Sequence, residues 1–445
     1  MEAVDTLINA RWVVPVEPDC RPLEHHTVAV RGGRIEAILP SAEAIGRFSA
    51  GEVIERPSHV LIPGLVNAHT HAAMTLFRGF ADEIPLDGWL QNRIWPAEAA
   101  FVGADFVGVG VELAIAEMLR SGTTCFADMY FYPEVTGRIA HRMGIRAALG
   151  MIFIRFDTNY SAAGDLMEKA RDLLDAYKGD PRIWTVFAPH APHTVDEEVL
   201  LEIRKLADEV DLPVHMHLHE TAREVADGVA SSGARPLARL DGLGLLSPNL
   251  MAVHMTQLED HEIERIATTG VSVVHCPESN LKLASGACPT ARLTAAGVNV
   301  ALGTDGAASN NDLDMFGEMR SAALLAKHHA ADASALPAET VLRMATLNGA
   351  KALNRDDEIG SLSAGKWADI TCVDLDSYAT QPVYDVVSQL VYAASREQVS
   401  DVWVAGQQRV SARRVVGVDE NQLFAQAEQW RARIDEASKN RGPAA

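Results

Sequence analysis

The sequence contains few cysteines. There are five in 445 residues, and no two of them form a Cys-x-x-Cys pair. An odd, scattered set of this kind is not a disulfide framework, nor does it supply a cysteine-based zinc site. We therefore expect a reduced chain in the cytoplasm.

Long apolar runs and excess positive charge are also missing. No run reaches the roughly 18 apolar residues of a membrane span, and the N-terminus has Glu2 and Asp5 where a secretory signal would have basic residues. The 39 basic residues are outnumbered by 60 acidic ones, which gives a net charge of −21. This balance argues against nucleic acid or an anionic membrane as partner, because both bind basic surfaces.

Several chemical motifs are absent as well. There is no Gly-x-Gly-x-x-Gly or Walker loop, so no nucleotide cofactor is expected. His219 and Glu220 lack the second histidine of a zinc-protease helix. The zinc deaminase signature with Pro-Cys-x-x-Cys is missing, and Asp312-Leu313-Asp314 lacks the rest of a calcium loop.

What the sequence does contain is a regular alternation of apolar runs and amphipathic segments. Such a strand–helix repeat predicts a parallel sheet, and eight units predict closure into a (β/α)8 TIM barrel. An open doubly wound sheet is the alternative, but it binds its ligand at one switch point, whereas polar residues here end several strands. The predicted strands are 59–71, 122–129, 146–155, 184–190, 212–220, 251–256, 271–277 and 298–305.

Short β segments flank this region at both chain ends. We predict that 1–58 and 361–445 form one small discontinuous β-sandwich domain, and that 59–360 form the barrel. The domain includes a C-terminal helix, because apolar residues from Leu423 to Ile434 recur at helical spacing. Residues 441–445 are expected to fray.

Two histidines mark the first barrel strand as a candidate metal site. His69 and His71 are two residues apart on a strand, so their rings point to one face. His217 and Asp305 end other apolar runs, and a carboxylate there is costly unless a metal or a donor compensates it. Three imidazoles and one carboxylate suit one divalent metal, with zinc the first choice and iron or manganese as alternatives. For Asp305, an ion pair without a metal is the other interpretation.

The residues around this site suggest acid–base chemistry. Zinc lowers the pKa of a bound water to about 7, and Glu220, three residues after His217, is predicted to carry its proton to the substrate. His254 ends its own strand, where it could polarise the water or stabilise an oxyanion. His215 and His219 share the strand of His217, but all three cannot bind one ion. We interpret His215 as a buried interior histidine, and His219 could support the ligands.

The sequence resembles the amidohydrolase superfamily. The resemblance rests on Pro-Gly-Leu-Val-Asn-Ala-His-Thr-His at 63–71, His217 with Glu220, His254, and the Gly-Thr-Asp-Gly turn at 303–306. It implies a TIM barrel with a small β-sandwich built from both chain ends. Two-metal members carry a carboxylated lysine on the fourth strand, and 184–192 contains no lysine. The single-metal deaminase branch therefore matches better.

Within that branch, residues 89–98 and 187–192 resemble the 5-methylthioadenosine/S-adenosylhomocysteine deaminases. The resemblance implies that Glu98 holds the ribose hydroxyls and that His190 contacts the substrate. A solvated helix residue is the alternative for Glu98. The family also has arginines that reach the nucleoside tail, and Arg155 is a candidate that the sequence alone does not align.

These features predict a metal-dependent hydrolase that acts on C–N bonds and converts adenosine-type nucleosides to the inosine analogue plus ammonia. Glu220 would protonate the ring nitrogen, Asp305 would take the proton of water, and His254 would stabilise the attacking oxygen, with Glu220 and Asp305 both touching the substrate. Alternatives are a guanine or 8-oxoguanine deaminase, a triazine hydrolase, a two-metal cyclic amidase, and a barrel without catalysis. A homo-oligomer is left open.

Overall fold

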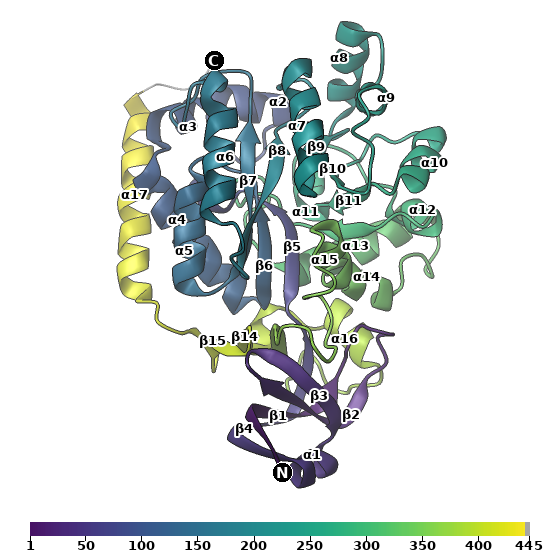
Figure 1. The fold of residues 1–445 in the computed structure, drawn as a ribbon. Helices are drawn as coiled ribbons and strands as arrows, with labels where there is room; N and C mark the ends of the chain where they lie inside the picture. Colours follow the sequence, from purple (N-terminus) through teal and green to yellow (C-terminus); the bar gives the residue numbers. More distant parts are fainter. Residues whose placement is uncertain (441–445) are drawn as a thin grey trace.

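A closed parallel barrel forms the centre of the molecule in the computed structural model, which describes residues 1–440 (Figure 1). Strands that follow one another in sequence pair in parallel, and the Asp305 N–H donates to the His69 carbonyl at 3.0 Å where the last strand meets the first. The predicted TIM barrel is confirmed. Its strands are β5 (Leu65–Thr70), β6 (Thr123–Asp128), β7 (Arg146–Phe153), β8 (Ile183–Pro189), β9 (Val214–Leu218), β10 (Leu250–His254), β11 (Ser272–His275) and β12 (Val300–Leu302).

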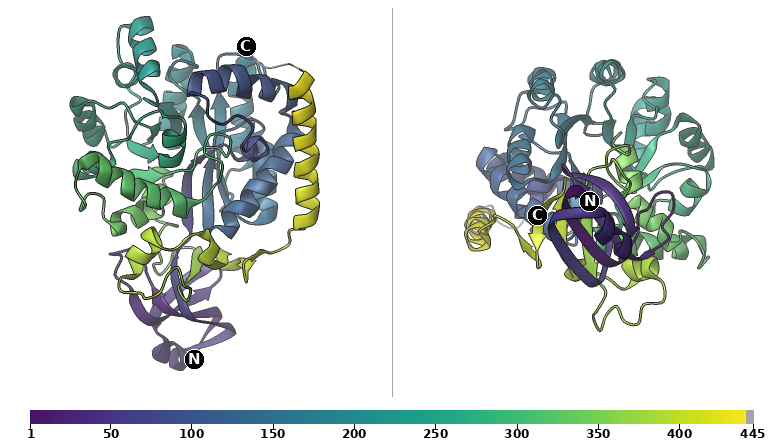
Figure 2. Two further views of the ribbon diagram at one scale, coloured as in Figure 1. Left: turned by 180° about the vertical axis from the view of Figure 1, so that it is seen from behind. Right: turned by 60° about the horizontal axis from the view of Figure 1, so that its bottom comes forward.

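Helices surround this barrel (Figure 2). They form because each has one apolar face: in α7 (Glu197–Val210), for example, Leu200, Ile203 and Ala207 are buried at helical spacing. The other helices of this part are η1 (Ala72–Phe77), α2 (Leu86–Trp89), η2 (Leu90–Ile94), α3 (Trp95–Phe101), α4 (Ala104–Arg120), α5 (Pro133–Met143), η3 (Ala163–Asp165), α6 (Leu166–Ala176), α8 (Ala222–Ser232), α9 (Pro236–Gly242), α10 (Asp260–Thr269), α11 (Pro277–Lys282), α12 (Thr290–Ala295), α13 (Met315–Ala330), α14 (Ala338–Met344), α15 (Leu347–Ala352) and α16 (Val386–Tyr392).

Both chain ends build a second sheet, which lies below the barrel in Figure 1. The sheet bends until its two hairpin turns touch, so closely that a Cβ on Gly33 would lie 2.7 Å from the Ala405 carbonyl oxygen. Ile8, Ile370 and Trp403, from both halves, share one apolar core. The elements are β1 (Glu2–Val13), β2 (Leu23–Arg31), β3 (Arg34–Pro40), α1 (Ser41–Arg47), β4 (Phe48–Pro63), β13 (Ile370–Asp374), η4 (Arg396–Gln398), β14 (Val399–Val404), β15 (Gln407–Ser411) and β16 (Arg414–Val415).

The strand predicted at 59–71 is in fact two strands. β4 pairs with β1 and β13 up to Pro63, so residues 59–63 lie in the second sheet, and β5 begins at Leu65. Gly64 joins them, and a Cβ there would lie 2.0 Å from the Thr124 Oγ1. The apolar pattern runs on unbroken because both sheets bury their part of it. The exact domain limits stay a prediction.

The C-terminal helix α17 (Glu420–Asn440) is present but packs elsewhere than predicted. The sequence predicts this helix as part of the small domain, whereas it lies along α4 of the barrel (Figure 1). The Trp430 and Phe106 rings meet edge to face with centroids 5.3 Å apart, and Leu423 and Ile434 are buried. An apolar stripe predicts a helix but not its partner. The fraying predicted for 441–445 falls outside the described residues.

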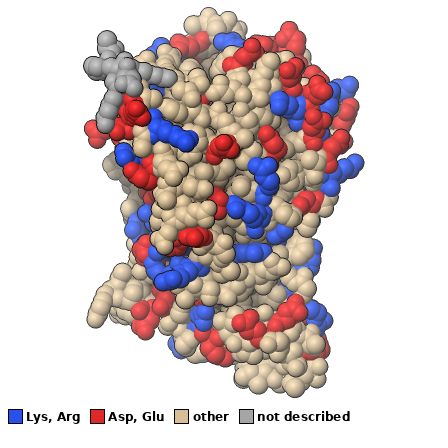
Figure 3. Space-filling view, turned by 90° about the vertical axis from the view of Figure 1, so that its left-hand side faces the viewer, with Lys and Arg blue, Asp and Glu red and all other residues tan. Residues whose placement is uncertain are grey.

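Residues 1–440 contain neither a single helix that could span a membrane nor a disulfide. No single helix is long and apolar enough to cross a membrane, although Leu90–Phe101 and Ala104–Arg120, bent by 113°, pass that test as a pair. The five cysteines are all free, which agrees with the prediction of a reduced chain, and all five are buried. On the face shown in Figure 3, basic and acidic side chains are interspersed.

A buried ion pair joins the barrel to the second sheet. Arg146, the first residue of β7, donates from its Nε to the Asp369 Oδ2 at 2.6 Å, and both side chains are almost fully buried. The Asp369 Oδ1 also accepts the Ala405 N–H at 2.7 Å. The same carboxylate therefore holds one barrel strand and the β14–β15 turn.

Replacing Asp369 with alanine should destabilise the protein, because it leaves the Arg146 guanidinium buried without its charge partner. Breaking a buried pair in this way costs about 3–5 kcal/mol, and we expect Tm to fall by at least about 3 °C. Arg431→Ala, which removes an exposed pair with Glu428, should leave Tm unchanged. Equal Tm values for the two variants in calorimetry would contradict the prediction.

Candidate metal centre and active site

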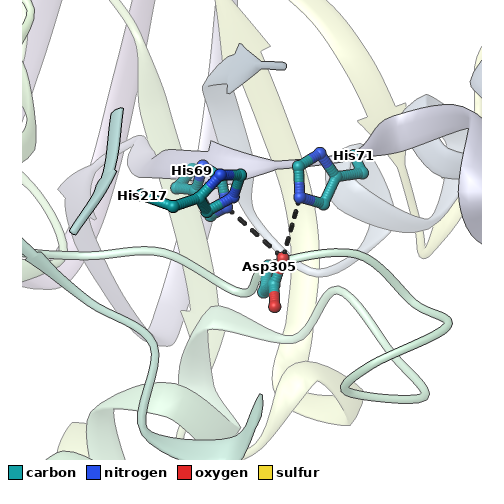
Figure 4. Close-up of side chains that lie close together, drawn as sticks. All are labelled: His69, His71, His217 and Asp305. Atoms are coloured by element: carbon teal, nitrogen blue, oxygen red, sulfur yellow. Dashed lines mark ion pairs between the residues drawn. The ribbon is translucent and has the colours of Figure 1, made fainter. Parts of the chain in front are cut away.

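Four side chains converge at the carboxyl ends of the barrel strands (Figure 4). His69 lies in β5 and His71 directly follows it, His217 lies in β9, and Asp305 follows β12. Their candidate ligand atoms all lie within 4.8 Å of one another. This is the face on which TIM barrels carry their active sites. The four residues predicted as ligands are thus brought together in a group that could hold one ion.

Asp305 is the most tightly held of the four. Its Oδ2 accepts hydrogen bonds from the hydroxyls of Ser279 at 2.7 Å and Ser309 at 2.8 Å. Its Oδ1 lies 3.3 Å from the His69 Nε2 and 3.1 Å from the His71 Nε2. Burial acts to raise the pKa of Asp305, but these two imidazoles outweigh it and hold the pKa well below its usual range.

Main-chain carbonyls orient two of the histidines. The His71 Nδ1 donates to the Met129 carbonyl at 2.6 Å, and the His217 Nδ1 donates to the His190 carbonyl at 2.8 Å. A carbonyl can only accept, so the proton of each neutral ring is on Nδ1. In the neutral form of each ring, the lone pair of Nε2 therefore faces the centre of the group.

The buried Nε2 of His69 shows that the group suits a metal. Among the described residues this nitrogen has no hydrogen-bond partner, although the Asp305 Oδ1 lies 3.3 Å from it. A buried polar atom without a partner is costly, and a bound cation would compensate it. Burial lowers the pKa of His69 to about 4, so its ring is neutral at pH 7. For His71, burial is outweighed by Asp305, which raises the pKa to about 9. A cation at the site would compete with that proton.

Glu220 and His254 face each other beside the group. The His254 Nε2 lies 3.7 Å from the Glu220 Oε2, and its Nδ1 lies 2.9 Å from the Asn280 Oδ1, which orients the ring. Burial raises the pKa of Glu220, which suits a group that both donates and accepts a proton.

The backbone of Glu220 is fixed on both sides. The Glu224 carboxylate accepts the Glu220 N–H at 2.6 Å, and the Thr256 hydroxyl donates to the Glu220 carbonyl at 2.7 Å. Sequence reasoning missed both residues, and also Asn280 and the two serines on Asp305. For Glu224 a signal existed: Thr221 caps α8 by accepting its N–H, and Thr-x-x-Glu is a capping-box pattern.

A cavity of about 1000 Å³ opens onto the group. Glu98, His190 and Arg155 all line it, together with Glu220 and Asp305. Glu98 accepts a hydrogen bond from the Tyr130 hydroxyl at 2.7 Å, and burial raises the pKa of Glu98 to about 7. It is therefore part of the cavity wall rather than a solvated helix residue.

His215, in β9, and His219, directly after it, are the two other histidines of this segment, and neither points into the four-residue group. The His219 ring accepts the Leu237 N–H at 3.1 Å and so faces α9. His215 is fully buried in the barrel, and its Nε2 lies 2.9 Å from the Nδ1 of His69. Neither belongs to the four-ligand group.

Comparison with known proteins shows which protein family has this sequence and fold. The sequence profile of the amidohydrolase family matches residues 60–409. The chain belongs to the amidohydrolase family. This confirms the resemblance and the prediction of a hydrolase acting on C–N bonds.

Similar amidohydrolases match along almost the whole chain. The 5-methylthioadenosine/S-adenosylhomocysteine deaminase of Teredinibacter turnerae is 47% identical over 97% of this chain and 98% of its own length. The 5'-deoxyadenosine deaminase of Methanosarcina barkeri is 42% identical over 95% and 97%. A crystal structure of an adenosine deaminase from Xanthomonas campestris with bound zinc is 54% identical, has a TM-score of 0.97, and covers 98% of this chain and 99% of that one.

The purified amidohydrolase should contain about one equivalent of zinc, because three imidazoles and one carboxylate complete a single four-ligand site. Elemental analysis tests this, and Asp305→Ala should lose the metal while His261→Ala, which changes an exposed histidine, should keep it. Removing zinc with a chelator should lower Tm, and adding zinc back should restore it. Two equivalents in the unaltered protein would contradict the single-metal site.

Proposed function

We propose that this amidohydrolase deaminates adenosine-type nucleosides by hydrolysis, with 5-methylthioadenosine and S-adenosylhomocysteine as preferred substrates and adenosine next. The products are the inosine analogue and ammonia. The observation that carries the proposal is that Glu98, suited to ribose hydroxyls, lines the same cavity as the four-ligand group and Glu220. The names of the relatives support the same activity.

His69, His71, His217 and Asp305 would hold the zinc. When bound, zinc would supply the positive charge that lowers the pKa of water to about 7. The remaining chemistry is assigned to side chains of this chain, which bind the nucleoside and move protons in a cavity partly shielded from water.

Glu220 is placed to act on the purine ring. Burial favours its protonated form, from which it donates a proton to the ring nitrogen N1 as the water oxygen attacks C6. Asp305 accepts one proton from the water and passes it to the amine, which leaves as ammonia. Glu220 recovers a proton when the C6 hydroxyl becomes a carbonyl. His254, beside Glu220, stabilises the charge on the attacking oxygen.

The rest of the cavity selects the nucleoside. The Glu98 carboxylate accepts the two ribose hydroxyls, and His190, held by the Thr194 hydroxyl at 2.9 Å, contacts the substrate. Deamination of guanine or 8-oxoguanine would give Glu98 no sugar to bind, as would hydrolysis of a triazine. β8 has no lysine to bridge a second metal. We also propose that the enzyme works in the cytoplasm without a nucleic-acid or membrane partner, as its acidic composition favours.

Glu220→Gln should abolish most turnover while zinc stays bound, because the amide keeps the shape but cannot carry the proton. We expect kcat for 5-methylthioadenosine to fall by at least about 10²-fold, measured as ammonia release. Glu209→Gln, which changes an exposed carboxylate of α7 outside the cavity lining, should remain near normal. A nearly normal rate in Glu220→Gln would move the proton-carrying role to another residue.

Glu98→Ala should weaken selection for nucleosides. Two charge-assisted hydrogen bonds of about 1.5–3 kcal/mol each are lost, so we expect kcat/KM for 5-methylthioadenosine to fall by at least about 10²-fold. Zinc content should not change. Tyr130→Phe, which keeps the carboxylate, should have a smaller effect. In a substrate panel with the unaltered enzyme, faster turnover of guanine or a triazine than of any adenosine derivative would rule out the nucleoside assignment.

A further inference from the structure

His215 is a polar residue in an apolar part of the barrel. Its ring is fully buried, its cross-strand neighbour is Met251, and Val186 and Val253 belong to the same interior cluster as Met251. A polar ring in such a position costs free energy unless it makes hydrogen bonds. Its Nδ1 makes none within the described chain. The contact between its Nε2 and the His69 Nδ1 is therefore the interaction that needs explanation.

The contact has the geometry of a directed hydrogen bond. The two nitrogens are 2.9 Å apart, and the rings meet at 89° with centroids 4.9 Å apart. Between two neutral imidazoles, one nitrogen must donate and the other accept. If His215 donated, the proton of His69 would be on Nε2 and would face the Asp305 carboxylate. If His69 donates, its Nε2 carries a lone pair toward the four-ligand group.

His69 differs from the other two histidines of the group in this respect. The Nδ1 protons of His71 and His217 go to main-chain carbonyls, which any sequence supplies and which can only accept. The Nδ1 of His69 instead has a side chain, that of His215, as its hydrogen-bond partner. The side chain at position 215 is thus the contact on which the orientation and tautomer of His69 depend.

We propose that His215 is a positioning residue for the metal centre: it accepts the hydrogen bond of the His69 Nδ1 and so keeps the Nε2 of His69 free to bind zinc. The proposal rests on the metal centre described above but not on the nucleoside substrate. Residues that hold a metal-ligating histidine in this way typically change metal affinity about 10–100-fold when replaced.

Three substitutions separate this role from simple packing. His215→Phe keeps a flat ring but has no acceptor. In His215→Gln the side-chain oxygen is as many bonds from Cβ as the lost Nε2, so an acceptor can return to the same place. His215→Asn places its oxygen at the Nδ1 position, too short to reach His69. The Gln and Asn variants are both polar and differ by one methylene group, which makes them a matched pair.

The measurement is the zinc dissociation constant, obtained by competition with a fluorescent chelator and without any nucleoside. We expect it to rise about 10–100-fold in His215→Phe and His215→Asn and to stay within about threefold of normal in His215→Gln. The Tm of the metal-free proteins serves as the control for packing. Loss of deaminase activity alone has no bearing on this result.

Two results would overturn the proposal. One is normal zinc affinity in His215→Phe or His215→Asn. The other is zinc affinity in His215→Gln as weak as in His215→Asn while the metal-free Tm values agree. If His215→Phe does not fold, the Gln and Asn pair decides the question alone.

Discussion

The buried carboxylate of Asp305 lies where the barrel closes, and much of the active site follows from how its charge is satisfied. Its own N–H donates to the His69 carbonyl at 3.0 Å, and the Thr70 hydroxyl donates to its carbonyl at 2.9 Å. Its carboxylate accepts hydrogen bonds from two serine hydroxyls on neighbouring segments. An unpaired charge at this depth would cost several kcal/mol. The contacts that prevent this cost also bring the ends of β5 and β12 together at the site.

The backbone at the strand ends is the second constraint. His254 and Asp305 adopt left-handed conformations, with φ of 75° and 60°. This conformation is strained for residues other than glycine and is concentrated at functional sites. Val253 already faces the interior, so regular alternation would turn His254 outward toward the helices. The left-handed turn instead brings its ring to Glu220. The strained backbone at His254 thus lowers stability, but it orients the His254 ring toward Glu220.

The barrel and the four-ligand group could be predicted from the sequence because each depends on short, contiguous sequence patterns. Buried strands appear as short apolar runs, and residues such as His217 and Asp305 stand where those runs end. The roles of Glu98 and His190 came from resemblance rather than from the pattern. Partners such as Asn280 and Ser309 could not be predicted, since an ordinary polar residue on another segment has no spacing that marks it. The break at Gly64 was hidden because apolar residues continue through it.

The break at Gly64 connects the first barrel strand directly to the second sheet. β4 is paired on both sides in the second sheet, and only Gly64 separates it from β5. The position of β5, which carries His69 and precedes His71, is therefore tied to the register of β4 in the second sheet as well as to its own pairing with β6 in the barrel. Side chains alternate along a strand, so a shift of β5 by one residue would turn the His69 ring to the opposite face of the barrel sheet. The small domain, far from the chemistry, therefore helps to hold the first two residues of the candidate metal site in place.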